Sequence, residues 1–398
     1  MVRLLALCLP MAALFVACGS DNSNATLPEG GFDAVRAMAD IQHLTTEIGA
    51  RPSGSDAARA AADYIAEQFG EARFGVFRAN YTYEIDPNRP ATVTVSGEAI
   101  AAVTAGGSKA GAATASAIDV GAADGIAPNS IRGRIAIASR GGSTFREKYE
   151  AARIGGAAAL VILNAEPGEL VANLGRDVEF PVVTVSGDPA AKVAAAAQLE
   201  SQLTIAVPPP QLGTGTNLVA RSPTAHSCVF LMMANYDSAT GSPGANDDAS
   251  GVAIMLELAR QFIRLDKSKV PAVCFAAMDG GFSGGTGASS YASSLTPLSQ
   301  PAAVIDLHAA GAGGPIAVFG ETNLVADVRE IAAQFGIQLE TTTAAPGDLD
   351  SFTGPGVSTL QISRSGAETA STIDPEKLRE AGVLAGELMT RLGKITRR

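Results

Sequence analysis

Hydrophobic residues recur with helical spacing near the beginning of the chain and form strand-like runs further along it. Val35, Met38 and Ile41 lie on one face of a predicted helix, and a second helix is predicted over residues 57–69. From residue 216 onward, apolar runs alternate with an amphipathic helix, which predicts an α/β fold with a mixed, largely parallel sheet and helices on both faces. The strands are predicted at residues 217–220, 229–234 and 270–278, and the helix at residues 250–263.

A segment of different composition separates these two regions. Residues 92–125 are rich in alanine, glycine, serine and valine, and a proline run at residues 208–210 ends the segment. Apolar strand-like stretches at residues 133–141, 159–164 and 180–185 and a helical pattern at residues 145–154 lie between them. Their order resembles the protease-associated domain, a small β-rich module inserted into exported peptidases. We therefore expect residues 31–88 and 211–398 to form one domain, with residues 89–210 inserted in it.

The beginning of the chain is typical of a bacterial export signal. A short basic start precedes an apolar run from Leu4 to Val16, and Phe15-Val16-Ala17-Cys18 resembles a lipoprotein cleavage box. We expect residues 1–18 to be the signal with its lipid-attachment cysteine and residues 19–30 to be a polar tether. Lipid on Cys18 would anchor the exported chain to a bacterial membrane in the cell envelope. An ordinary cleavable signal followed by a chance cysteine is the alternative.

The net charge bears on the class of binding partner, and the cysteine content bears on disulfide formation. The 29 basic and 40 acidic residues give a net charge of −11, so a nucleic-acid partner is not expected. Cleavage of the signal and acylation would leave Cys228 and Cys274 as free thiols or as a bridge. Two buried thiols are the default expectation; a bridge requires Cα atoms within about 7 Å, which neighbouring strands could supply.

Several motifs in the second region carry a more specific resemblance. Residues 217–220 read Asn-Leu-Val-Ala, residues 235–238 read Asn-Tyr-Asp-Ser, and residues 244–251 read Gly-Ala-Asn-Asp-Asp-Ala-Ser-Gly. Further along the chain follow Met278-Asp279-Gly280, Gly284, Gly287 and Tyr291. Together they resemble the exported zinc aminopeptidases of the family that includes bacterial leucyl aminopeptidases and glutamate carboxypeptidase. The resemblance implies two zinc ions that polarise the scissile carbonyl and activate water, with a glutamate as general base.

Most of the positions that this family uses for catalysis hold other residue types here. The resemblance places the general base at Gly281 and leaves Asp247 as the retained bridging aspartate. Arg364 falls on the last histidine ligand, and Leu349 falls where a Ser-Asp-His motif has its histidine. The degenerate metal positions are therefore Asn235, Asp247, Phe282, His308 and Arg364. Since an amide, a phenyl ring and a guanidinium cannot replace these ligands, we expect no catalytic residue, no metal and no other cofactor.

The expected function follows from this loss. We expect a pseudopeptidase whose cleft binds a peptide or whose insert meets a protein partner. Without zinc the charge of Asp247 requires another partner, which we expect to be Arg364 or a protonated His308.

Two other hypotheses keep a catalytic role. One is an active metallo-aminopeptidase with zinc in a rebuilt site at Asp247 and His308, joined by Asp279 or Asp348. The other makes Ser283, within Gly-Phe-Ser-Gly-Gly, a nucleophile with His308 as its base. Structural roles are also open for several of these residues. His43 and His226 could be ordinary surface or half-buried residues. Helix capping or the bracing of turns could account for Asp237, Asp247 and Asp279.

Overall fold

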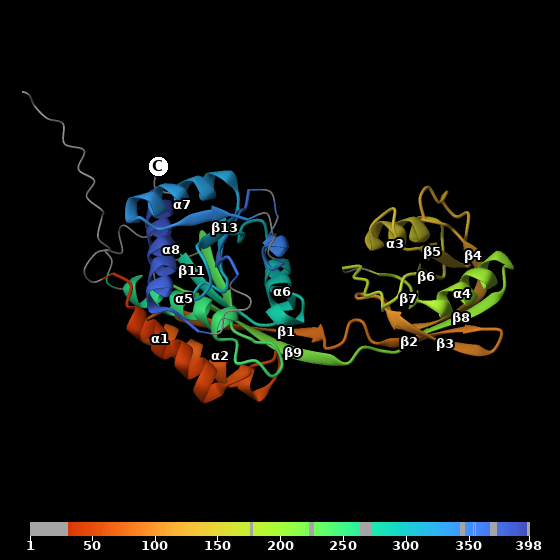
Figure 1. Cartoon of the computed structure of the whole chain (residues 1–398), viewed down its shortest axis with the longest axis horizontal. Coiled ribbons are helices and arrows are strands. Elements are labelled where there is room, and N and C mark those ends of the chain that lie inside the picture. The colour runs from red at the N-terminus through yellow and green to blue at the C-terminus, as the bar shows by residue number, and fades with distance from the viewer. Residues whose placement is uncertain are drawn as a thin grey trace, which may run out of the picture. The chain divides into compact units, whose positions relative to one another are not determined.

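The computed structural model describes residues 31–395 except 176–177, 223–226, 263, 265–272, 343–346, 353, 355 and 367–371. Cys18 and His226 therefore lie outside the described residues. The chain divides into two compact units, and Figure 1 shows the elements of each. The first unit contains the chain up to Arg78 and from Asn217 onward, and the second contains Ala79–Thr216.

An eight-stranded sheet forms the centre of the first unit. Its strands are β1 (Gly75–Glu84), β9 (Leu212–Arg221), β10 (Phe230–Asn235), β11 (Val273–Met278), β12 (Ala303–Leu307), β13 (Ile316–Gly320), β14 (Leu339–Thr341) and β15 (Ser358–Arg364). They lie in the order β1-β9-β11-β10-β12-β15-β13-β14. The four central strands, β11, β10, β12 and β15, run parallel, while β9 and β13 are antiparallel to their central neighbours. The predicted mixed, largely parallel sheet is confirmed.

Helices cover both faces of this sheet. Along β10, Phe230 and Met232 point into one hydrophobic core, whereas Leu231 and Met233 point into another, because side chains alternate along a strand. The first core is closed by α1 (Ala34–Gln42), α2 (Asp56–Glu71), α5 (Gly251–Phe262), α7 (Thr322–Phe335) and α8 (Pro375–Ile395). The second core is closed by α6 (Thr286–Ser294) and the short helical turn η4 (Leu349–Phe352).

Of the three residues predicted to share one face of α1, Ile41 is buried and Met38 packs against the core, but Val35 does not. Val35 is 80% exposed, while Ala37 and Ile41 are buried in the core. The helix begins after Asp33, whose side chain accepts a hydrogen bond from the Arg36 N–H. Small alanines thus form part of the buried stripe that a count of large apolar residues overlooks.

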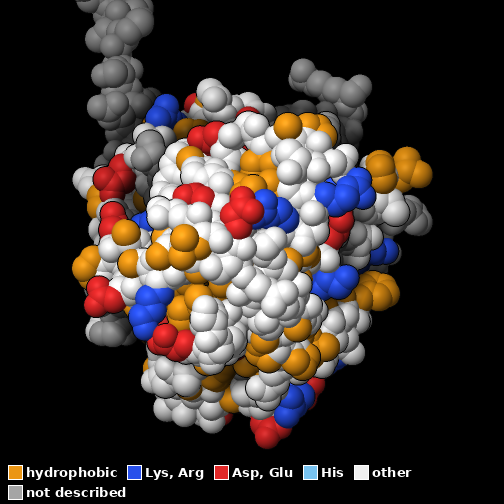
Figure 2. All heavy atoms as spheres, turned by 90° about the vertical axis from the view of Figure 1, so that its right-hand side faces the viewer, with side chains coloured by type: hydrophobic (Ala, Val, Ile, Leu, Met, Phe, Trp, Pro, Cys, Tyr) orange, Lys and Arg blue, Asp and Glu red, His pale blue; other side chains and the backbone are white. Residues whose placement is uncertain are grey.

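The second unit is a closed barrel of seven strands in the order β2-β3-β7-β6-β5-β4-β8. They are β2 (Pro90–Val95), β3 (Glu98–Thr104), β4 (Gly111–Asp119), β5 (Ile135–Ser139), β6 (Ala159–Asn164), β7 (Val182–Ser186) and β8 (Gln202–Val207), with helices α3 (Phe145–Ile154) and α4 (Asp188–Gln198). Val161 of β6 points into one core and Leu160 into a second core with Tyr149 of α3, which explains the unbroken apolar run of β6. Figure 2 shows acidic and basic side chains interspersed on the face turned to the viewer.

Cys228 and Cys274 form a disulfide, so the expectation of two free thiols is wrong. Their Cα atoms lie 5.3 Å apart. Cys274 is paired with Leu231 in the parallel ladder of β10 and β11, which brings the start of β10 beside it. The bridge lies at the amino-terminal ends of the two strands, opposite the carboxyl ends at Asn235 and Asp279.

Candidate functional site

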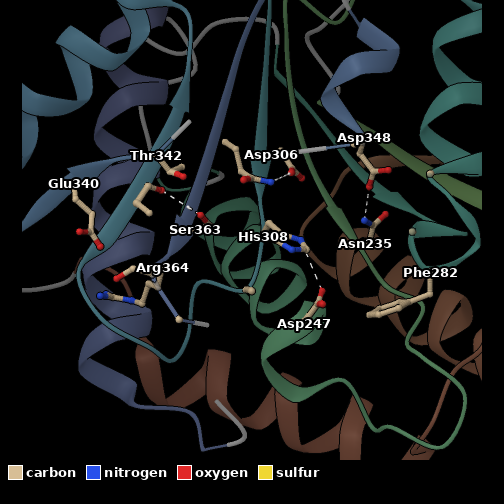
Figure 3. A pocket seen from close by; sticks show the side chains of 18 of the residues that line it. Asn235, Asp247, Phe282, Asp306, His308, Glu340, Thr342, Asp348, Ser363 and Arg364 are labelled. Carbon is tan, nitrogen blue, oxygen red and sulfur yellow. Dashed lines mark hydrogen bonds and ion pairs between the residues drawn. The ribbon is translucent and has the colours of Figure 1, made fainter. Parts of the chain in front are cut away.

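The sequence-predicted site residues meet at the carboxyl ends of the parallel strands, where sites in such sheets lie. Asn235 ends β10, Asp279 follows β11, and His308 follows β12. A cavity of about 910 Å³ opens there, and its lining includes Asn235, Asp247, Gly281, Phe282, His308 and Arg364 (Figure 3). The structure therefore brings together all five degenerate positions and the expected base position.

The side chain of Asn235 is hydrogen-bonded to a carboxylate. Its Nδ2 donates a hydrogen bond to Asp348 Oδ2 at 2.5 Å, which links the end of β10 to the segment before η4. The backbone N–H of Asn235 donates to Asp248 Oδ2 at 3.1 Å. The backbone N–H and the side-chain amide of Asn235 therefore both donate to carboxylates. The side chain also forms part of the cavity wall.

We expected either Arg364 or His308 to lie beside Asp247, and in the structure it is His308. Its Nδ1 lies 3.7 Å from Asp247 Oδ1 and 3.9 Å from Asp248 Oδ2. The side chains of His308 and Asp247 are each about one third exposed, at 33% and 32%, whereas Asp248 is fully buried. The expected pairing of Asp247 is thus confirmed for His308, which faces the cavity in Figure 3.

Arg364 does not contribute to that pairing, because its guanidinium contacts the loop after β12 and helix α8 instead. Its Nε donates to the Ala310 carbonyl at 2.9 Å, Nη1 to the Gly314 carbonyl at 3.0 Å, and Nη2 to Glu380 Oε2 at 2.7 Å. Arg364 is only 5% exposed. The guanidinium therefore joins β15 to the loop after β12 and to α8.

Phe282 and Ser283 lie in the helical turn η3 (Gly281–Ser283), which follows β11. Phe282 is 48% exposed and contributes a phenyl face to the cavity. Ser283 is not among the residues that line the cavity, although Phe282 and Gly284 on either side of it are. This placement gives no support to Ser283 as a nucleophile acting on a ligand in the cavity.

Buried carboxylates surround the site. Asp237 accepts hydrogen bonds from the backbone N–H groups of Gly281 and Phe282, at 2.9 and 3.2 Å. Burial, followed by the charge of Asp279, raises the pKa of Asp237 to about 7. Burial also raises the pKa of Asp306 to about 6. The structural reading of Asp237, as a brace for the turn after β11, agrees with these contacts.

Asp248 and Arg51 fix the other side of the site. Asp248 Oδ1 accepts from the backbone N–H groups of Gly251 and Ala309, at 3.2 and 3.0 Å, and burial raises its pKa well above the usual range. The buried Arg51 donates to the carbonyls of Tyr236, at 2.9 Å, and of Leu44, Gly49 and Pro243. Burial lowers the pKa of Arg51 to about 10. These groups hold the loops from two sides without a metal ion.

The residues present do not suit a pair of zinc ions. At the positions of the five ligands, Phe282 has no donor atom, Arg364 has no lone pair, and Asn235 offers a neutral amide already bonded to Asp348. Within the described residues, no three His, Cys, Asp or Glu side chains are placed to hold a metal ion together. The groups at these positions form hydrogen bonds and a charge pair with their protein neighbours instead.

Sequence reasoning missed several residues of the cavity wall. Asp306, Gln361 and Glu340 line the cavity, and Gln361 Nε2 donates to Asp306 Oδ2 at 2.9 Å. Asp306 could have been found, because an ionisable residue within the apolar strand Ile305-Asp306-Leu307 requires a buried partner. Glu340 carries no such signal, since it belongs to a three-residue strand.

Comparisons with known proteins show which families the two parts of the chain resemble. Residues 217–377 match the model described as peptidase family M28, and residues 95–193 match the PA domain. The chain is 30% identical over 250 residues to aminopeptidase YwaD of Bacillus subtilis, covering 60% of this chain and 53% of that protein. It is 29% identical over 240 residues to the "probable lipoprotein aminopeptidase LpqL" of Mycobacterium tuberculosis, covering 54% and 45%. The chain thus spans about half the length of these curated relatives.

Solved structures share the fold over most of the chain. An aminopeptidase from Aneurinibacillus sp. strain AM-1 has a TM-score of 0.66 and 23% identity, covering 90% of this chain and 93% of that one. The zinc aminopeptidase BSAP from Bacillus subtilis has a TM-score of 0.58 and 25% identity, covering 92% and 96%. The chain therefore matches peptidase family M28 over residues 217–377 and the PA domain over residues 95–193, and it shares the fold of these aminopeptidases.

Proposed function

We propose that this protein is an exported, catalytically inactive relative of the zinc aminopeptidases, which binds a peptide in the cavity at the strand ends. The observation that carries the proposal is the donor set of that cavity. A catalytic zinc site uses about three protein ligands and an open position for water, and a dinuclear site needs more. Here Arg364 and Phe282 supply none, and the base position is a glycine.

The contacts of the substituted residues support a binding role. Asn235 is bonded to Asp348, His308 lies beside Asp247, and Arg364 is bonded to Glu380. Each of these residues is thus engaged in a contact of its own, and the cavity stays open at about 910 Å³. A polar cavity of this size, with a phenyl face at Phe282, suits a peptide segment better than a small ion.

We also propose that lipid on Cys18 anchors the protein to a bacterial membrane in the cell envelope. The Phe-Val-Ala-Cys sequence supports this, as does the similarity to LpqL, whose printed name is that of a lipoprotein. The disulfide between Cys228 and Cys274 is consistent with an oxidising compartment outside the cytoplasm. No described helix has the length and hydrophobicity that crossing a bilayer requires.

Purified protein tests the catalytic part of the proposal. We expect no turnover of a panel of chromogenic amino-acid amides, with or without added zinc, and a zinc content far below two ions per chain by elemental analysis. The matched control is Asp247→Ala, which should behave as the wild type in both measurements. Stoichiometric zinc with turnover that Asp247→Ala abolishes would instead establish an active metallo-aminopeptidase with a rebuilt site.

A further inference from the structure

The outermost strand of the eight-stranded sheet borders the cavity. β14 pairs with β13 on one side, and within the described part of the chain no further strand pairs with its other side. Glu340 and Thr341 of β14 and the following Thr342 line the cavity, and Figure 3 shows Glu340 and Thr342 on that wall. The open edge of the sheet and the cavity therefore meet at these residues.

The ladder with β13 shows which backbone groups of β14 face outward. The carbonyl of Gln338 and the N–H of Thr342 both bond to β13, at 3.3 and 3.1 Å. Successive residues of a strand direct their hydrogen-bonding groups alternately to its two sides, so Glu340 also turns its N–H and carbonyl to β13. The corresponding groups of Leu339 and Thr341 therefore face the open edge, where another strand could pair with them.

The cavity beside this edge has an excess of acidic groups. Among the described lining residues Arg364 is the one arginine, and it is already bonded to Glu380 and to backbone carbonyls, while His308 lies beside Asp247. The zinc ions that balance such acids in relatives do not suit this donor set. The lining carboxylates are those of Asp247, Asp306, Glu340 and Asp348.

Resting on the proposed peptide-binding function, we propose that an extended peptide adds a strand to the outer edge of β14 and places a lysine or arginine side chain in the cavity. In this mode of recognition the main-chain hydrogen bonds supply affinity, and a pocket for a side chain supplies specificity. The acidic lining favours a basic side chain over a neutral or acidic one. The edge strand alone would accept any extended peptide, so the cavity is the part that selects.

A defined set of peptides tests the mode of binding. The probe is a fluorescein-labelled, acetylated peptide of alternating threonine and valine with one central lysine, and the measurement is fluorescence anisotropy. We expect saturable binding to the wild type. Methylation of alternate backbone nitrogens on the pairing edge should weaken the Kd about tenfold or more, because each lost hydrogen bond contributes about 1 kcal/mol. Replacement of the lysine by norleucine or glutamate should weaken binding as well.

Thr341→Pro tests the edge from the protein's side. It removes an outward N–H without removing a bond to β13, and proline is tolerated at such edge positions. We expect the Kd for the lysine peptide to rise about fivefold, since one hydrogen bond of about 1 kcal/mol is lost, with an unchanged thermal midpoint. Thr341→Ala is the matched control: it also loses the threonine hydroxyl near Arg329 but keeps the N–H, so it should weaken binding less than Thr341→Pro does.

The outcomes separate this inference from the proposed function. If the wild type binds the peptide and Thr341→Pro binds it equally well, edge pairing is wrong and peptide binding stands. If the wild type binds none of the peptides, the proposed function fails and the inference fails with it. If Thr341→Pro lowers the thermal midpoint, the test is instead the binding of the N-methylated peptide to the wild-type protein. Edge pairing would be wrong if that peptide bound as tightly as the unmethylated one. Equal affinity for the lysine and glutamate peptides would overturn the role of the cavity.

Discussion

The side chain of Asn235 occupies the space into which a side chain at Gly281 would project. A Cβ atom at Gly281 would lie 2.5 Å from Asn235 Nδ2, closer than two such atoms approach. Asn235 is held there by its bond to Asp348. The two positions that the family resemblance assigns to a metal ligand and to the general base are therefore coupled, because a side chain cannot be added at Gly281 unless Asn235 moves.

A double-mutant cycle measures this coupling. We expect Gly281→Ala to lower the free energy of unfolding by about 1–3 kcal/mol, because the added methyl group overpacks the site. In an Asn235→Ala background the same substitution should cost much less, so the coupling energy should exceed about 0.5 kcal/mol. Urea titrations of the four proteins measure it. Strict additivity would show that the asparagine does not restrict this position.

The disulfide should contribute strongly to the stability of the first unit. Cys228 and Cys274 close a loop with a sequence separation of 46, and cross-links of this kind contribute about 2–4 kcal/mol, chiefly by restricting the unfolded chain. We expect the double variant Cys228→Ala, Cys274→Ala to lose a free energy of unfolding in this range. The control is reductant, which should destabilise the wild type but leave the double variant unchanged. An equal response of both proteins to reductant would contradict the prediction.

Stability should fall as the pH rises towards neutrality. The pKa of Asp237 is about 7 in the folded protein, whereas an aspartate in an unfolded chain titrates near about 3.9. Between these values the native state binds more protons, so its stability is full at the acidic end and is lost as the pH rises through about 7. Asp306, with its pKa raised to about 6, acts in the same direction.

Urea titrations from about pH 5 to about pH 8 test this linkage. The free energy of unfolding should fall by a few kcal/mol over this range, since one pKa unit corresponds to about 1.4 kcal/mol. Asp237→Asn is the matched variant, because it removes the titrating group while keeping one acceptor for the turn of Gly281 and Phe282. Its midpoint should depend less on pH than that of the wild type. A wild-type midpoint that rises with pH would refute the assignment.

Periodicity and motifs predicted the elements better than they predicted the contacts between them. The helix at Phe145–Ile154 and the strand at Ala159–Asn164 have the predicted bounds, since an N-terminal cap at Thr144 and an unbroken apolar run define them locally. The disulfide depends instead on the register between β10 and β11, which no local pattern encodes. Large apolar residues also misled the reading of α1, where Val35 faces solvent.

The site shows the same division. Its members were predictable because the strand ends of a parallel sheet converge, and the motifs mark those ends. Their partners were less so: Arg364 was expected near Asp247, but it bonds to Glu380, sixteen residues further along the chain, because α8 packs against the sheet beside β15. The bond between Asn235 and Asp348 joins residues separated by 113 positions and has no sequence signal at all.

Arg364→His would return the family's residue to the last ligand position, and we expect it to destabilise the protein without restoring a metal site. The guanidinium donates to three backbone carbonyls and to Glu380, and an imidazole can replace only one of these bonds. The free energy of unfolding should fall by at least about 2 kcal/mol, since several buried acceptors lose a charged donor. Glu380→Gln should cost less, because that side chain is 39% exposed. Thermal unfolding with and without zinc measures both variants; a zinc-dependent rise in the midpoint of Arg364→His, absent from the wild type, would show that this one residue keeps the metal out.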